Sequence, residues 1–138
     1  MLGGVSRFTL GMACTKELNP MDDRYAALRQ GLVDAVLSSS GASDSTVRRA
    51  VEERAAALGG RASATTNAVP LALAAYVDKV ATCAYTVTDE DVAMLCQAGY
   101  SEDMIFEITV SAALGAARAR LQRGLAALKG DSDATPAG

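Results

Sequence analysis

The fold of this chain is decided by two neighbouring segments, VTDEDV at residues 87–92 and AGYSEDMIFE at residues 98–107. Thr88 and Asp91 have the Thr-x-x-Asp spacing of a capping box, in which each side chain bonds the other residue's backbone N–H at a helix start. Gly99 is the residue type that ends helices in a left-handed conformation, and Ser101 is a good N-cap for a following helix. The two segments therefore predict a short helix, a tight turn and a second helix.

Helical spacing of apolar residues continues on both sides of these segments. It predicts helices over about 20–37, 44–58, 70–84, 88–98 and 102–129, with residues 85–87 as a short extended connector. Asn19 is expected to cap the first helix, with Pro20 at its first position, and Ser43 to cap the second. We predict an all-α fold with a single bundle of about five helices. Residues 1–19 form a flexible arm, 20–129 the helical domain and 130–138 a flexible tail.

Composition narrows the class of protein. The 138 residues are 50% apolar, 21% charged and only 4% aromatic, which fits one globular domain with an alanine-rich core. Acidic and basic residues are interspersed, and the net charge is −3. This pattern argues against a nucleic-acid groove and against a polybasic membrane patch. No apolar run approaches the ~18 residues of a membrane span, and we expect a cytoplasmic protein.

The last helix is apolar on two sides, which is typical of a helix covered twice. Ile105, Ile108, Ala112 and Ala116 form one face. In so short a chain we expect the second face to meet another subunit, and small residues such as Gly115 and Ala119 permit close helix approach. The expected interface of a homo-oligomer consists of Phe106, Val110, Leu114, Ala117 and Leu121.

The helix over 44–58 is expected to carry Val47, Ala50, Val51, Ala55 and Leu58 on its apolar face. Arg48 with Glu52, and Arg49 with Glu53, have the (i, i+4) spacing of ion pairs. We place both pairs on the solvent side of that helix.

Five short segments resemble a known family: YVDKV at 76–80, VTDED at 87–91, AGYSED at 98–103, IFE at 105–107 and AALGA at 112–116. Together they are similar to the carboxymuconolactone decarboxylase and alkylhydroperoxidase D superfamily. The resemblance is strong over a little more than a third of the chain. It implies an oligomeric helical bundle of the alkylhydroperoxidase D type.

The residues that make that family catalytic are missing. Its active members carry a CxxC and a His on the helix before the Gly-Ser turn, with a Glu upstream; the two sulfurs cycle between dithiol and disulfide while Glu and His move protons. In an alignment on Gly99, the His place falls on Asp91, the cysteine places near Val87 and Ala84, and the Glu place near Val80. The chain contains no histidine at all, so no catalytic role carries over.

Cys83, Cys96 and Tyr85 are the remaining candidates for a site. Cys83 lies one residue from a cysteine place of the family, but it is near a helix C-terminus, where the helix dipole opposes a thiolate. Lys79 is the one cation close to it in sequence. Cys96 is expected to be a small core residue, and a Cys83–Cys96 disulfide is conceivable. Tyr85 is a candidate pocket residue.

A cluster of carboxylates is more simply explained by helix starts than by a metal site. Asp89, Glu90, Asp91, Glu102, Asp103 and Glu107 lie at two predicted helix N-termini, where negative charge complements the helix dipole. Carboxylates of this kind also bind hard cations, but no histidine accompanies them. We expect no metal and no cofactor.

Three hypotheses about function follow. The first is a non-catalytic helical homo-oligomer, acting as a scaffold or binding a small molecule. The second is a weak thiol peroxidase or related oxidoreductase that uses Cys83, with Cys96 as a second thiol. The third is an adaptor that binds an unidentified protein through the exposed surface of the 44–58 helix, including Arg48 and Arg49.

Overall fold

The computed structural model describes residues 20–62 and 68–130, with side chains from residue 24 onward in the first range. Within these residues the chain is helical and has no strand, which confirms the predicted all-α bundle. The elements, in order, are α1 (Pro20–Ser38), α2 (Ser45–Leu58), α3 (Leu71–Cys83), a 3₁₀ turn (Ala84–Thr86), α4 (Asp89–Gln97) and α5 (Glu102–Leu128).

The caps that decided the fold have the predicted geometry. The Thr88 hydroxyl accepts from the Asp91 backbone N–H at 3.4 Å, and the Asp91 carboxylate accepts from the Thr88 N–H at 2.9 Å. Gly99 has a φ of 97°, which L-residues with a side chain rarely adopt. Ser101 Oγ accepts from the Met104 N–H at 3.2 Å and starts α5. Local side-chain chemistry therefore fixes both ends of the α4–α5 turn.

Two local predictions were wrong. Asp44, not Ser43, caps α2, because its carboxylate accepts from the Thr46 N–H at 2.7 Å while Ser43 is bound to Glu107 on α5. The connector after α3 is not extended throughout, because residues 84–86 form a 3₁₀ turn. The Val87 N–H donates a hydrogen bond to the Ala84 carbonyl at the end of this turn. Asn19, residues 1–19 and residues 131–138 lie outside the described part of the chain.

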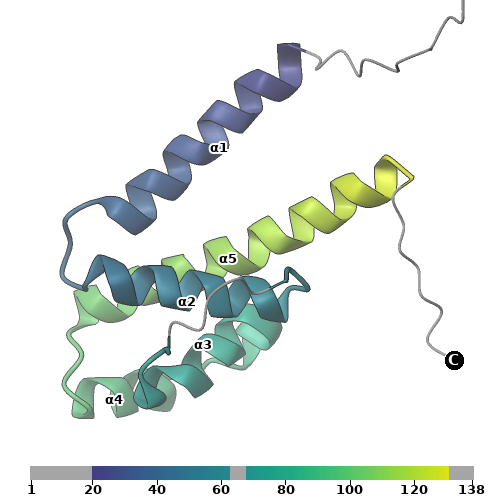
Figure 1. Cartoon of the computed structure of the whole chain (residues 1–138). Coiled ribbons are helices and arrows are strands. Elements are labelled where there is room, and N and C mark those ends of the chain that lie inside the picture. The colour runs from purple at the N-terminus through teal and green to yellow at the C-terminus, as the bar shows by residue number, and fades with distance from the viewer. Residues whose placement is uncertain (1–19, 63–67, 131–138) are drawn as a thin grey trace, which may run out of the picture.

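The core lies where α5 packs across α2 and α3, with α4 at one end (Figure 1). The predicted inner face of α5 is buried, which confirms Ile105, Ile108, Ala112 and Ala116 as core residues. The other helices contribute mainly small and β-branched residues, with one tyrosine, Tyr76, whose hydroxyl bonds Thr109 on α5 at 2.7 Å. The remaining core residues are Val51, Ala55, Leu73, Val77, Ala81 and Leu95.

The contact between α2 and α5 depends on a glycine. A Cβ placed on Gly115 would collide with the backbone carbonyl of Glu52 on α2. A Cβ on Gly59, at the end of α2, would lie 2.7 Å from the Cβ of Ala119. The small residues of α5 therefore permit close helix approach, as predicted, but in the described chain they face α2 of the same chain.

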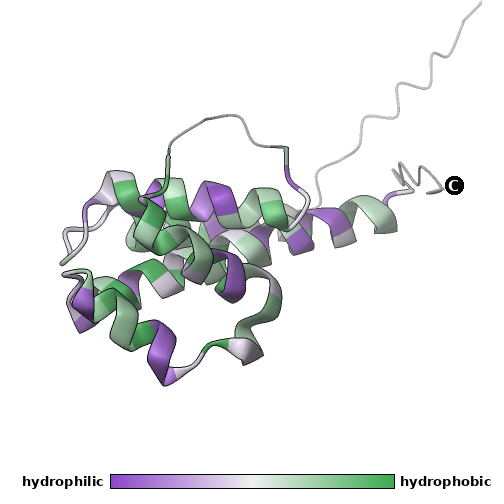
Figure 2. Ribbon diagram, turned by 90° about the horizontal axis from the view of Figure 1, so that it is seen from below, coloured by the Kyte–Doolittle hydropathy of each residue, from purple (hydrophilic) through white to green (hydrophobic). Residues whose placement is uncertain are grey.

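α1 stands apart from this body along most of its length. Among its described side chains only Val33 and Leu37 are buried, so α1 is attached by its C-terminal half. Figure 1 shows α1 and the second half of α5 extending past the other helices on the same side. Figure 2 shows hydrophilic and hydrophobic residues interspersed along this part of α5. The two helices therefore leave a seam between them.

The close α2–α5 approach makes a stability prediction. Gly115→Ala should lower the free energy of unfolding by about 1–3 kcal/mol, because the new methyl group overpacks the helix contact. Gly124→Ala, in the same helix, meets nothing within 4 Å. It should raise the free energy of unfolding by about 0.5–1 kcal/mol through helix propensity. Urea unfolding followed by circular dichroism measures both, and equal stability of the two variants would contradict the packing described here.

Candidate functional site

A buried arginine fixes where α1 joins the body. Arg48 on α2 is only 2% exposed. Its guanidinium donates to the carbonyl of Ser39, directly after α1, and to the carbonyl of Ser43 at 2.5 Å. It also pairs with the Glu107 carboxylate of α5 at 3.1 Å. One side chain therefore holds the end of α1, the loop after it and the first turns of α5 together.

Glu107 completes this cluster from the α5 side. Its carboxylate accepts from the backbone N–H groups of Ala42 and Ser43, both at 2.8 Å, and from the Ser43 hydroxyl at 2.5 Å. These hydrogen bonds from Ser43 and Ala42, together with the Arg48 charge, lower the pKa of Glu107 to about 2. Gly41 lies against the same carboxylate, which a Cβ at that position would strike.

A second buried charge joins α2 to the outer half of α5. Glu52 is 3% exposed and accepts from Arg118 of α5 at 2.6 Å and from Arg61 at 3.1 Å. The prediction of a solvent-side Arg48–Glu52 pair was therefore wrong, since both residues are buried and each has partners on other segments. The reason is that positions 48, 51, 52 and 55 share one helix face, so the charges lie beside Val51 and Ala55.

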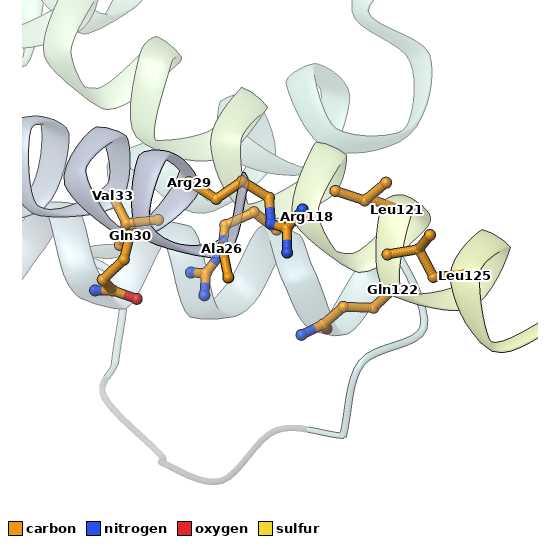
Figure 3. Close-up of a pocket in the computed structure, with 8 residues that line it drawn as sticks. All are labelled: Ala26, Arg29, Gln30, Val33, Arg118, Leu121, Gln122 and Leu125. Atoms are coloured by element: carbon orange, nitrogen blue, oxygen red, sulfur yellow. The ribbon is translucent and has the colours of Figure 1, made fainter. Parts of the chain in front are cut away.

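The seam between α1 and α5 contains a hollow of about 250 Å³. Figure 3 shows the side chains of Arg29 and Arg118 between Val33 and Gln30 of α1 and the leucines of α5. The lining combines guanidinium and amide groups with aliphatic side chains: Ala26, Arg29, Gln30, Val33, Arg118, Leu121, Gln122 and Leu125. We call this hollow the α1–α5 groove. A concave surface with a few convergent polar groups is the usual form of a small-ligand site.

The predicted oligomer interface borders the same seam. Phe106 and Val110 line a smaller hollow of about 160 Å³ with Ala35 and Val36 of α1, and Leu121 lines the α1–α5 groove. α1 therefore borders part of the apolar side of α5 that we expected a second subunit to cover. That cover is incomplete, because Phe106 remains 69% exposed; Leu114 is half-buried and Ala117 exposed.

Cys83 is the last residue of α3 and is partly buried as a free thiol. The one cation close to Cys83 in sequence is engaged elsewhere, since Lys79 Nζ donates to both carboxylate oxygens of Asp91 at 2.7 Å. The hydrogen bond from Lys79, and then that from the Thr88 N–H, lower the pKa of Asp91. Asp91 is thus both a capping residue and the partner of Lys79, and the charge of that lysine is compensated.

The other two candidates are both exposed. Cys96 is a free thiol on the surface of α4, so the prediction of a core residue was wrong. The inner face of that short helix is taken by the buried Leu95. Tyr85, in the 3₁₀ turn, is 89% exposed and lines neither the α1–α5 groove nor the smaller hollow. The structure therefore does not bring Tyr85 and the groove residues together.

No family model, no curated protein and no solved structure matches the chain. The resemblance to the alkylhydroperoxidase D superfamily therefore stays a prediction. Across 20–62 and 68–130, no group of acidic and cysteine side chains is arranged to hold a metal ion. In the same ranges, no helix combines the length and apolar character required to cross a bilayer.

Sequence reasoning missed the residues that build the groove. Arg29, Gln30, Gln122 and Leu125 were not singled out, because nothing local indicates that α1 lies along α5. One signal was present: α5 has no acidic residue after Glu107 but carries Arg118, Arg120 and Arg123. Of these three arginines, only Arg118 lines the groove.

The Arg48–Glu107 cluster predicts a pH dependence. The pKa of Glu107 falls from its ordinary 4.5 to about 2 in the fold. The ionised Glu107 carboxylate therefore contributes fully to the free energy of unfolding above pH 4.5. This contribution is lost as the pH falls toward 2. Glu107→Gln should lower the free energy of unfolding at neutral pH by about 3 kcal/mol, because Arg48 becomes a buried charge without its counter-ion. The difference in free energy of unfolding between the variant and the parent should then become smaller in acid.

Urea unfolding at neutral pH and at several acidic values measures this gap. Glu102→Gln, in the first turn of the same helix and exposed, is the control and should cost less than about 1 kcal/mol. A gap for Glu107→Gln that stays constant down to the acid limit would show that this carboxylate is not ionised in the fold.

Proposed function

We propose that this chain is a non-catalytic helical homo-oligomer, a divergent relative of the alkylhydroperoxidase D-like proteins, that serves as a scaffold. The observation that carries the proposal is the set of large apolar side chains left exposed on α1 and α5. Leu28 of α1 is 62% exposed, and Tyr25 and Leu32 on the same helix are at least half exposed. On α5, Phe106 is 69% exposed and Leu121 is 43% exposed.

A second copy of the chain is the occupant that this surface favours. Tyr25, Leu28 and Leu32 recur at helical spacing, so they form a stripe along α1 that another apolar helix can cover. A twofold dimer uses the same surface from both copies, and here α1 and α5 both offer apolar side chains at that surface. Burying such side chains stabilises the dimer by roughly 25 cal/mol for each Å² of apolar surface removed from water.

The absence of the catalytic residues supports the non-catalytic part of the proposal. The chain has no histidine to act as a general base. Lys79 is held by Asp91, so Cys83 has no free cation beside it on α3 to favour a thiolate. Cys96 is exposed on a different helix. The thiol peroxidase hypothesis thus has neither a histidine nor Lys79 to support its proposed nucleophile, and the adaptor hypothesis loses Arg48, which is buried.

Self-association is tested by charge insertion into the stripe. Leu28→Glu combined with Leu32→Glu should convert an oligomer into the 14.2 kDa monomer, because two carboxylates cannot be buried at an apolar contact. Light scattering after size exclusion and sedimentation velocity measure the mass. Leu71→Glu is the matched control, because Leu71 is also exposed but lies at the start of α3. A parent chain that is monomeric at all concentrations would overturn the proposal.

The enzyme alternative is tested by peroxide consumption. The purified chain should reduce hydrogen peroxide and an organic hydroperoxide, with a dithiol as reductant, no faster than the double variant Cys83→Ser, Cys96→Ser. Thiol alkylation should reach Cys96 before Cys83, because Cys96 is the more exposed. Turnover by the parent that disappears in Cys83→Ser would instead establish the thiol peroxidase.

A further inference from the structure

The α1–α5 groove has more positive than negative charge. Arg29 is exposed and has no hydrogen bond or ion pair within 24–62 and 68–130. Arg118 shares the single carboxylate of Glu52 with Arg61. Two guanidinium groups therefore line the groove, and the carboxylate that Arg118 contacts is shared with Arg61, in a chain whose net charge is −3. The surplus is local and lies beside a hollow.

No acidic residue is among those that line the groove. α5 carries no acidic residue after Glu107. On α1, Asp34 is the one acid among the described side chains; it accepts from Gln30 at 3.0 Å and does not line the groove. A guanidinium at the edge of an apolar hollow is a strong donor to a planar anion, because it presents paired N–H groups that match a carboxylate.

The other wall of the groove is apolar. Leu121 and Leu125 lie one turn apart on α5, and Val33 and Ala26 add apolar lining from α1. The hollow of about 250 Å³ is smaller than the ~300–1,000 Å³ of most drug-sized ligand sites. Its size and lining therefore favour a small molecule with one negative head group and a short hydrocarbon chain.

We propose that the α1–α5 groove binds a small amphipathic carboxylate. The carboxylate head lies between Arg29 and Arg118, and the hydrocarbon chain lies along Leu121 and Leu125. Gln30 and Gln122 flank the hollow and supply amide donors to the same head group. This site does not rest on self-association, because Leu28 and Leu32, whose substitution tests that proposal, do not line the groove. Leu121 is shared by the two surfaces.

The test uses the full chain and octanoate as the probe, in isothermal titration calorimetry. Octanoate should bind once per chain, and added salt should weaken the binding because exposed charges are screened. Arg29→Ala should weaken the affinity about tenfold, the usual cost of one charged hydrogen bond. Arg24→Ala should leave the affinity unchanged, because Arg24 is on the same helix and exposed but does not line the groove.

Chemical controls separate charge recognition from simple apolar adsorption. Octanol should bind much more weakly than octanoate, and octylammonium should not bind. Octanol binding as tightly as octanoate, equal effects of Arg29→Ala and Arg24→Ala, or no octanoate binding at all would each overturn the site. Asp131 and Asp133, in the tail, are competing anions in the same chain. If octanoate binds only after Asp131 and Asp133 are both changed to Asn, the groove is occupied by the tail of the chain itself, and the proposal is overturned.

The same titration on the Leu28→Glu, Leu32→Glu variant separates this site from the proposed scaffold. Octanoate binding that needs Arg29 in a chain found to be monomeric would overturn the scaffold and leave the site standing. An oligomer that the double variant dissociates, but that fails to bind octanoate, would overturn the site alone.

Discussion

The placement of Arg48 is the constraint on which the rest of this fold depends. A guanidinium that is 2% exposed must be matched in charge and in hydrogen bonds, because an unpaired buried charge costs several kcal/mol. Its partners are the carbonyls of Ser39 and Ser43 and the carboxylate of Glu107. Pairing the two terminal nitrogens of Arg48 therefore fixes the exit of α1, the start of α2 and the first turns of α5 relative to one another, while its buried Nε has no hydrogen-bond partner among the described residues.

This arrangement explains why α1 is anchored at one end and open at the other. Only Val33 and Leu37 of its described side chains are buried, and both belong to the half that leads into the Arg48 cluster. The other half runs beside α5 without filling the space between them. Glu52 holds Arg118 at the α5 wall of that space. Buried charges therefore fix both the point where α1 is attached and the position of one groove residue.

Much of the secondary structure could be predicted from sequence, because the signals are local. Thr88 and Asp91, Gly99 and Ser101 each act on residues within one turn, so their effects do not depend on the rest of the fold. The inner face of α5 was also predictable, since Ile105, Ile108, Ala112 and Ala116 repeat at helical spacing. Ser43 shows the limit of such reasoning: its hydroxyl suits a cap, yet a carboxylate 64 residues away takes it.

The candidate site could not be predicted, because it is formed between the first and last helices. Arg29 and Arg118 are far apart in sequence, and each alone is typical of a solvent-facing helix position. The buried charges were mistaken for surface pairs because Arg48 and Glu52 have the spacing of an exposed ion pair. The same spacing also puts them in register with Val51 and Ala55 on the face toward α5, and tertiary contact decided between the two interpretations.

Gly41 carries a consequence for how this protein can change over evolution. Its lack of a side chain leaves room for the Glu107 carboxylate, which four donors hold in place and which cannot swing aside cheaply. Substitutions at positions 41 and 107 are therefore coupled. Descendants that keep the acid must keep the glycine, and a lineage that loses the acid frees position 41 to accept a larger residue.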